Sequence, residues 1–168
     1  MNLCKTNNKS SLRRLIRPLL TLLLLAATLL TLSCKQEESA PEYAIDPAVL
    51  AEQLATELKF DDTLVALTTE ATALKFPYGQ ASAFCWAGSG ATAEIVLAAA
   101  YPDPAAAEAA LPRFEAYLDS QANLFATYNA AEVPKIESAV CSAFGRWIVM
   151  TVCPDPDAAL AIIQQFEA

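Results

Sequence analysis

The sequence predicts an α+β domain in which a leading helix is followed by ββαββα. We expect a four-stranded, mainly antiparallel sheet with helices packed on one face. Asp-Pro pairs at 46–47, 103–104 and 155–156 each precede an apolar helical period, and β-rich segments precede the second and third pairs. Asp caps a helix because its carboxylate accepts first-turn N–H groups, and Pro is tolerated at the first helical position. The three pairs therefore predict three helix starts.

The expected helices span about 47–59, 104–128 and 156–167. Pro112 lies inside the second and must kink or split it, because proline lacks a backbone donor and crowds the preceding turn. The segment 61–76 is ambiguous between a turn and a short helix over 68–75. Helical spacing predicts these buried residues: Leu50, Leu54 and Leu58; then Leu111, Phe114, Leu118 and Phe125; then Leu160, Ile163 and Phe166.

A strand–turn–strand–helix pattern occurs twice. Residues 82–85 (SAFC) resemble 138–141 (SAVC), and 101–104 (YPDP) resemble 153–156 (CPDP). Either an internal duplication or convergence on the same turn and cap chemistry explains the likeness.

The turns of the two units differ in composition. The first lies around Ala87-Gly88-Ser89-Gly90, and the second is Gly145-Arg146. Gly at the first position of a two-residue loop favours a type II′ hairpin, which would place Cys141 opposite Met150.

Residues 1–33 have the layout of an export signal. Five basic residues precede the apolar run Leu19–Leu32, which ends at Ser33 and Cys34. This resembles the lipobox of bacterial lipoproteins, in which the cysteine is diacylated and becomes the N-terminus. An uncleaved anchor is the alternative, but a helix over this run rises only about 21 Å against a hydrocarbon core of about 30 Å. We expect residues 34–45 to be the lipidated cysteine and a flexible tether, and 46–168 a single domain.

Removal of the signal leaves six basic residues against 19 acidic ones, a net charge of −13. Such a domain repels nucleic acid and anionic lipid head groups. We therefore expect contact with the membrane through the lipid anchor only, on the outer face of the cytoplasmic membrane.

Several short motifs resemble those of a known family. They are Phe60-Asp61-Asp62, the segment 88–94 (GSGATAE) and Glu132-Val133-Pro134, between the first helix and the Gly145 hairpin. The chain is similar, over about residues 48–167, to small lipoproteins of Gram-positive bacteria that carry domain of unknown function four-three-five-eight. Ile95 replaces an acidic residue expected after Glu94. The resemblance implies the fold and the location, and it brings no activity.

No catalytic set, metal site or cofactor is expected. The chain has no histidine, which removes Ser-His and Cys-His pairs, histidine ligands and the usual general base. Its carboxylate pairs are Asp61-Asp62 and Asp155/Asp157, and helix capping explains the second pair better than catalysis does.

The remaining cysteines, Cys85, Cys141 and Cys153, are expected to be free and buried, although an exported protein permits a disulfide. Any bridge from Cys85 depends on a sheet order that the sequence does not provide.

The candidate binding surface combines a turn with an aromatic residue. The turn Gly88-Ser89-Gly90 could bind an anion through its backbone N–H groups. A hairpin loop whose glycines need positive φ explains the same residues better. The aromatic residue is Trp147, which begins a strand and is either partly exposed or part of the core. The surface comprises Gly88, Ser89, Gly90, Thr92, Glu94 and Trp147.

These features predict a lipid-anchored extracytoplasmic binding module without catalytic activity. It would contact a protein partner through its sheet surface or the Gly88–Thr92 hairpin. The alternative is a lipoprotein that binds a small molecule or cell-wall ligand as an accessory to uptake. A compact pocket lined by two or more carboxylates would favour an enzyme, and a flat apolar patch would favour a protein partner.

Overall fold

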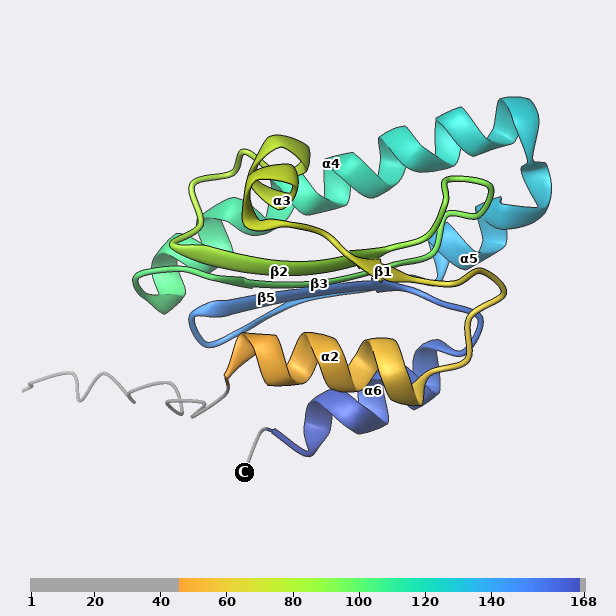
Figure 1. Ribbon diagram of the computed structural model, residues 1–168. Coiled ribbons are helices and arrows are strands. Elements are labelled where there is room, and N and C mark those ends of the chain that lie inside the picture. The colour runs from red at the N-terminus through yellow and green to blue at the C-terminus, as the bar shows by residue number, and fades with distance from the viewer. Residues whose placement is uncertain (1–45, 167–168) are drawn as a thin grey trace, which may run out of the picture. The chain divides into compact units, whose positions relative to one another are not determined.

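The computed structural model describes residues 46–166, which form a five-stranded antiparallel sheet between two layers of helices (Figure 1). The signal segment, Cys34 and the tether lie outside the described residues. The strand order is β1-β2-β3-β5-β4. In chain order the elements are α2 (Pro47–Glu57), β1 (Val65–Ala66), α3 (Thr69–Lys75), β2 (Ser82–Ala87), β3 (Ile95–Ala100), α4 (Pro104–Tyr128), η1 (Ala130–Glu132), α5 (Val133–Glu137), β4 (Val140–Phe144), β5 (Trp147–Val152) and α6 (Pro156–Gln164).

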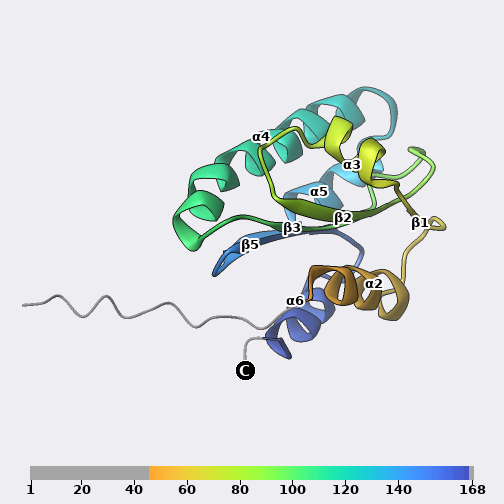
Figure 2. The ribbon, with the colours of Figure 1, turned by 60° about the vertical axis from the view of Figure 1, so that its left-hand side comes forward.

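Helices cover both faces of the sheet, so the expected one-sided packing is wrong. Figures 1 and 2 show α2 and α6 on one face and α3, α4 and α5 on the other. The reason lies in the central strands β3 and β5, which are buried at all six of their positions. Alternate residues of a strand point to opposite faces, so a strand buried throughout needs a cover on each side.

Each face carries its own apolar core. Leu54 and Ile163 pack with Val96 and Val149 on the α2/α6 face. On the α4 face, Phe114 stacks on Phe76 at 5.9 Å between ring centroids, and both pack with the alternate residues of the same central strands. The sheet is therefore a shared wall between two cores.

The three predicted helix starts are confirmed. The carboxylates of the N-cap residues accept first-turn N–H groups at 2.8–3.0 Å: Asp46 from Ala48, Asp103 from Ala106 and Asp155 from Ala158. Among helices within residues 46–166, none is both long and apolar enough to cross a bilayer.

The helix ends differ in detail from the prediction. The first and third helices stop at Glu57 and Gln164, and α4 continues through Pro112 without splitting. Leu160 is exposed, contrary to expectation, because the buried face of α6 is centred on Ala159 and Ile163.

The second hairpin has the predicted register. Cys141 lies opposite Met150, and Phe144 opposite Trp147. Gly145 has a φ of +57°, and no described non-glycine residue has a positive φ, which is the sign pattern of a type II′ turn.

The first hairpin and the strand count differ from expectation. The last pair of β2 and β3 is Ala87 with Ile95, so a loop of residues 88–94 replaces the expected tight turn. The fifth strand, β1, is only two residues long, too short for apolar periodicity to reveal it.

The structure argues against an internal duplication. The hairpins β2–β3 and β4–β5 lie on either side of the sheet centre, which would suit a two-fold axis perpendicular to the sheet. Such an axis would keep the following helices on one face, but α4 and α6 cover opposite faces. The likeness between the units is therefore confined to turn and cap chemistry.

The two-sided packing predicts large effects of core truncation on both faces. We expect Phe114→Ala and Leu54→Ala each to lower the free energy of unfolding by about 3–4 kcal/mol, because each leaves a cavity in a closed core. Leu124→Ala, at an α4 residue that is 51% exposed, should change it by less than about 0.5 kcal/mol. Urea denaturation measures the free energy of unfolding of all three variants. A loss of stability in only one of Phe114→Ala and Leu54→Ala would contradict the two-layer arrangement.

Candidate functional site

The loop of residues 88–94 lies at one end of the sheet, against the segments that follow α2 and α4 (Figure 1). It is fixed by a cluster of polar side chains that we call the loop network. The loop network comprises Asp61, Asp62, Ser89, Thr92, Glu94, Glu132 and Lys135.

Glu94 is the buried centre of the loop network, with a side chain that is 0% exposed. Its carboxylate accepts the backbone N–H groups of Asp61 at 3.0 Å and Asp62 at 2.8 Å. It also accepts the ammonium of Lys135 at 3.0 Å. A buried carboxylate is costly unless its oxygens are hydrogen-bonded and its charge is balanced, and here both conditions are met.

Lys135 joins three carboxylates. Its Nζ lies 2.9 Å from Asp61, 3.0 Å from Glu94 and 3.1 Å from Glu132. Burial by itself lowers the pKa of Lys135, but hydrogen bonds to Asp61, Glu94 and Glu132 outweigh it and raise the pKa above its usual value. The lysine therefore stays charged and occupies the centre of the acidic group.

Asp62 anchors the tip of the loop. Its Oδ2 accepts the Ser89 hydroxyl at 2.6 Å and the Ser89 N–H at 2.7 Å. These bonds, the hydroxyl first, lower the pKa of Asp62 below its usual value. A Cβ at position 88 would lie 2.8 Å from the same oxygen, so the close approach of Asp62 requires glycine there.

The loop does not form the anion cradle considered from the sequence. The N–H of Ser89 binds the protein's own Asp62, and the N–H of Ala93 binds Glu132 at 3.0 Å. Gly90 has a φ of +91°, as a hairpin-type loop requires. Of the candidate residues here, Ser89 and Gly90 are exposed and Gly88 and Thr92 half-buried.

Two residues of the candidate binding surface are not at the surface. Glu94 is buried, and Trp147 is 4% exposed within the α2/α6 core, under the guanidinium of Arg146. Trp147 pairs with Ala100, at the opposite end of β3 from the loop, about 17 Å away at the usual strand rise. Most of the sheet surface is likewise unavailable, because helices cover β3 and β5 on both faces, although Phe84 on β2 is 39% exposed.

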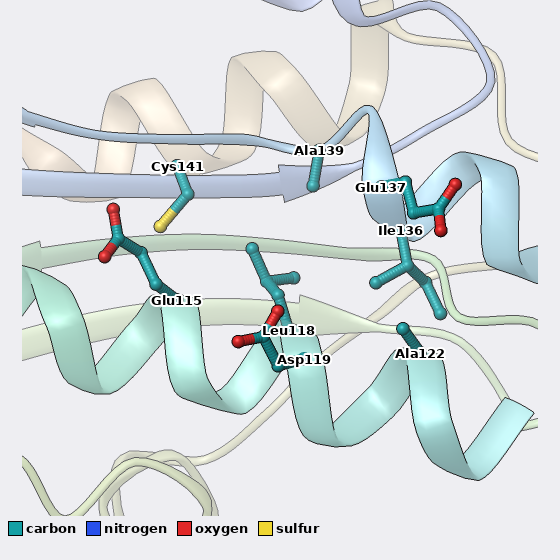
Figure 3. Close-up of a pocket in the computed structure, with 8 residues that line it drawn as sticks. All are labelled: Glu115, Leu118, Asp119, Ala122, Ile136, Glu137, Ala139 and Cys141. Carbon is teal, nitrogen blue, oxygen red and sulfur yellow. The ribbon is translucent and has the colours of Figure 1, made fainter.

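A pocket of about 270 Å³ lies where α4 and α5 meet β4. We call it the β4 pocket. Figure 3 shows carboxylates around an apolar floor, with the Cys141 thiol turned toward Glu115. The acids are all solvent-exposed. The lining residues are Glu115, Leu118, Asp119, Ala122, Ile136, Glu137, Ala139 and Cys141.

Cys85, Cys141 and Cys153 are free, as expected; Cys85 and Cys153 are buried, whereas Cys141 is half-buried, contrary to expectation. Cys85 and Cys141 occupy one row across β2, β3, β5 and β4, about 14 Å apart at the usual strand spacing and too far for a bridge. Cys153 packs on the opposite face. Burial, aided by the charge of Glu115, raises the pKa of Cys141 to about 12, so its thiol is a poor nucleophile at neutral pH.

Sequence reasoning named five of the seven loop-network residues but missed that Glu132 and Lys135 join them, and it missed all of the β4 pocket. The i,i+3 spacing of Glu132 and Lys135 was one available signal, and the i,i+4 spacing of Glu115 and Asp119 was another. Both patterns are common on solvated helices, so neither predicts a site without the fold. Within residues 46–166, no cluster of three or more His, Cys, Asp or Glu residues could hold a metal ion.

No protein-family model matches the chain, and no curated protein or solved structure matches it. The similarity to domain of unknown function four-three-five-eight therefore stays a prediction.

The loop network predicts that Lys135 stabilises the fold. We expect Lys135→Met to lower the free energy of unfolding by about 3 kcal/mol at pH 7, because buried Glu94 loses its countercharge. Because folding raises the lysine pKa, this contribution should persist below about pH 10 and fade as the pH rises through the folded-state value. Lys59→Met, at an exposed lysine, is the control. Equal urea midpoints for the two variants would contradict the role of Lys135.

The arrangement of the β4 pocket predicts that the negative charge of Glu115 slows the labelling of the Cys141 thiol. Removing the negative charge in Glu115→Gln should lower the thiol pKa and raise the iodoacetamide labelling rate of Cys141 at pH 9 by about twofold. Peptide-level mass spectrometry follows this residue separately from the other cysteines. Glu108→Gln, on the same helix, should leave the rate unchanged, and an equal response to both would contradict a local effect.

Proposed function

We propose that the chain is a lipid-anchored extracytoplasmic binding module without catalytic activity, tethered to the outer face of the cytoplasmic membrane through Cys34. The signal layout of residues 1–33 and the charge of −13 after its removal support this proposal. The observation that carries the binding role is the β4 pocket, which combines an apolar floor with carboxylates from α4 and α5.

The chemistry of the β4 pocket favours a cationic ligand group. Leu118, Ala122 and Ile136 offer apolar surface, while Glu115, Asp119 and Glu137 offer negative charge. A lysine or arginine side chain matches both parts, because its aliphatic stem packs on apolar surface while its charged end meets carboxylates. The binding role therefore moves from the hairpin to this pocket.

A pocket with several carboxylates also meets the condition that would favour an enzyme. Against this, all three acids are exposed to water, whereas catalytic carboxyl pairs commonly have one member in a dry, apolar setting. The nearby Cys141 thiol has a pKa of about 12 and lies in a chain without histidine. Binding explains the pocket better than catalysis does.

A small-molecule lipoprotein is the second candidate. The β4 pocket, at about 270 Å³, is close to the lower limit of about 300 Å³ for ligand pockets. A small organic amine would fit this volume and charge. Thermal shifts with a panel of amines, absent for uncharged analogues, would favour this alternative.

Anchoring is tested by substituting the lipidated cysteine. We expect Cys34→Ala to abolish fatty-acid labelling and release the protein from the membrane, because no acyl chains remain to hold it. Cys85→Ala is the control and should retain both properties. Labelled, membrane-bound Cys34→Ala protein would contradict the anchor.

Binding is tested by zero-length carbodiimide crosslinking in membranes, which joins carboxylates to partner amines. We expect capture of a partner or ligand amine through the β4 pocket. The triple variant Glu115→Gln, Asp119→Asn, Glu137→Gln should lose this product. The matched variant Glu52→Gln, Glu57→Gln, Glu108→Gln removes as many exposed charges elsewhere and should keep it. Equal capture by both variants would contradict the assignment of the pocket.

A further inference from the structure

The strand β4 forms one edge of the sheet. It pairs with β5 on one side, and the strand order ends with it. The other edge is partly closed, because β1 covers β2 at Ala87 and Trp86. In the part of the chain that the structure describes, no strand pairs with the outer side of β4.

The register identifies which backbone groups face outward. Phe144 and Trp147 flank a two-residue turn, and such a flanking pair exchanges both hydrogen bonds across the strands. Pairs alternate along the ladder, so Ser142 also bonds to β5, while Cys141 and Ala143 direct their N–H and C=O groups away from it. Between residues 46 and 166, neither residue makes a backbone hydrogen bond outside the sheet. Two donors and two acceptors are therefore open on this edge.

The β4 pocket lies directly beside this edge. Cys141 belongs to both, because its backbone faces outward while its side chain lines the pocket on the α4 side (Figure 3). A strand added to β4 would turn alternate side chains toward α4. One of them would lie over the pocket, close to Glu115 and Asp119.

We infer that β4 is a docking edge for an extended, basic peptide segment of a partner protein, which adds as a further strand and places a lysine or arginine in the β4 pocket. This rests on the proposed binding function and names its partner class. Backbone bonds to Cys141 and Ala143 supply the strand pairing, and the carboxylates of α4 and α5 select the positive side chain.

Charge argues against two other occupants. A second copy pairing through β4 would bring two acidic pockets and two domains of net charge −13 together, which like-charge repulsion opposes. The tether 35–44 carries one lysine against three glutamates and contains Pro41, and proline removes a donor that strand addition needs. A basic partner has neither disadvantage.

The experiment titrates the full lipoprotein, in nanodiscs of zwitterionic lipid, with a fluorescent peptide that alternates lysine with valine. Two further peptides serve as probes: one with glutamate for each lysine, and one with proline for the central valine. We expect saturable binding of the first peptide, and at least about tenfold weaker binding of the other two. Equal binding of the proline peptide would overturn strand addition, and equal binding of the glutamate peptide would overturn the charge selection.

Protein variants separate the edge from the pocket. The variant Ala143→Pro removes an outward N–H at an edge position where proline is tolerated and should weaken binding about tenfold or more. Reversal of the pocket charge in Glu115→Lys with Asp119→Lys should do the same. Glu52→Lys with Glu57→Lys, on α2, is the matched control and should retain affinity within about twofold.

Amide hydrogen exchange keeps the test decisive if Ala143→Pro fails to fold. Saturating lysine–valine peptide should slow exchange at Cys141 and Ala143 by about tenfold or more and leave Ser142 unchanged, since its N–H already bonds to β5. Unchanged exchange at all three amides would overturn the proposal. Protection without peptide, accompanied by a dimer in sedimentation, would also overturn it by showing a second copy on the edge.

The two proposals fail in different ways. If no peptide binds but carbodiimide captures a partner elsewhere on the domain, the docking edge is wrong and the binding function stands. If no peptide binds and nothing is captured, both are wrong.

Discussion

The rest of the structure depends on the burial of β3 and β5 on both faces. Each central strand is apolar at nearly every position and contributes alternate residues to two cores. A single layer of helices would leave one apolar face of the sheet in water, at a cost of about 25 cal/mol per Å². The chain avoids this because α2 and α6 cover one face and α3, α4 and α5 cover the other. The helices therefore cover both faces of the central strands, and the proposed binding function is placed at a sheet edge instead.

The loop network solves a different problem, at the end of the sheet. The long loop of residues 88–94 would be mobile if it depended on its own short side chains. Glu94 instead holds the segment after α2 through two backbone N–H groups, and Lys135 links that carboxylate to α5. Three segments distant in sequence are thereby fixed by one buried acid and one lysine. Because its polar groups are hydrogen-bonded within the protein, the loop network stabilises the fold rather than forming a binding site.

The outer side of β4 combines an open sheet edge with a pocket that carries carboxylates. Within residues 46–166, the outward N–H and C=O groups of Cys141 and Ala143 have no backbone partner, and Glu115, Asp119 and Glu137 line the pocket beside them. Natural sheets usually protect an open edge by shortness, charge or a cover. Here the acids of α4 and α5 provide charge, which discourages pairing with acidic strands and with the chain itself. The proposed docking of a basic strand relies on the same acids, because their charge opposes acidic partners and attracts basic ones.

Local chemistry in the sequence determined the helix starts, the Gly145 hairpin and its register, because Asp caps, proline and glycine act within a few residues. It also determined the net charge, the lack of histidine chemistry and the expectation of Cys34 lipidation. Only the tertiary structure decided that α4 and α6 cover opposite faces. An amphipathic helix can pack on either face of the sheet with the same apolar pattern. The tertiary structure also decided that Glu94 and Trp147 are buried, that Lys135 lies among three acids and that Cys141 lies at an open edge. These features join residues far apart in the chain, and local propensity carries no information about such contacts.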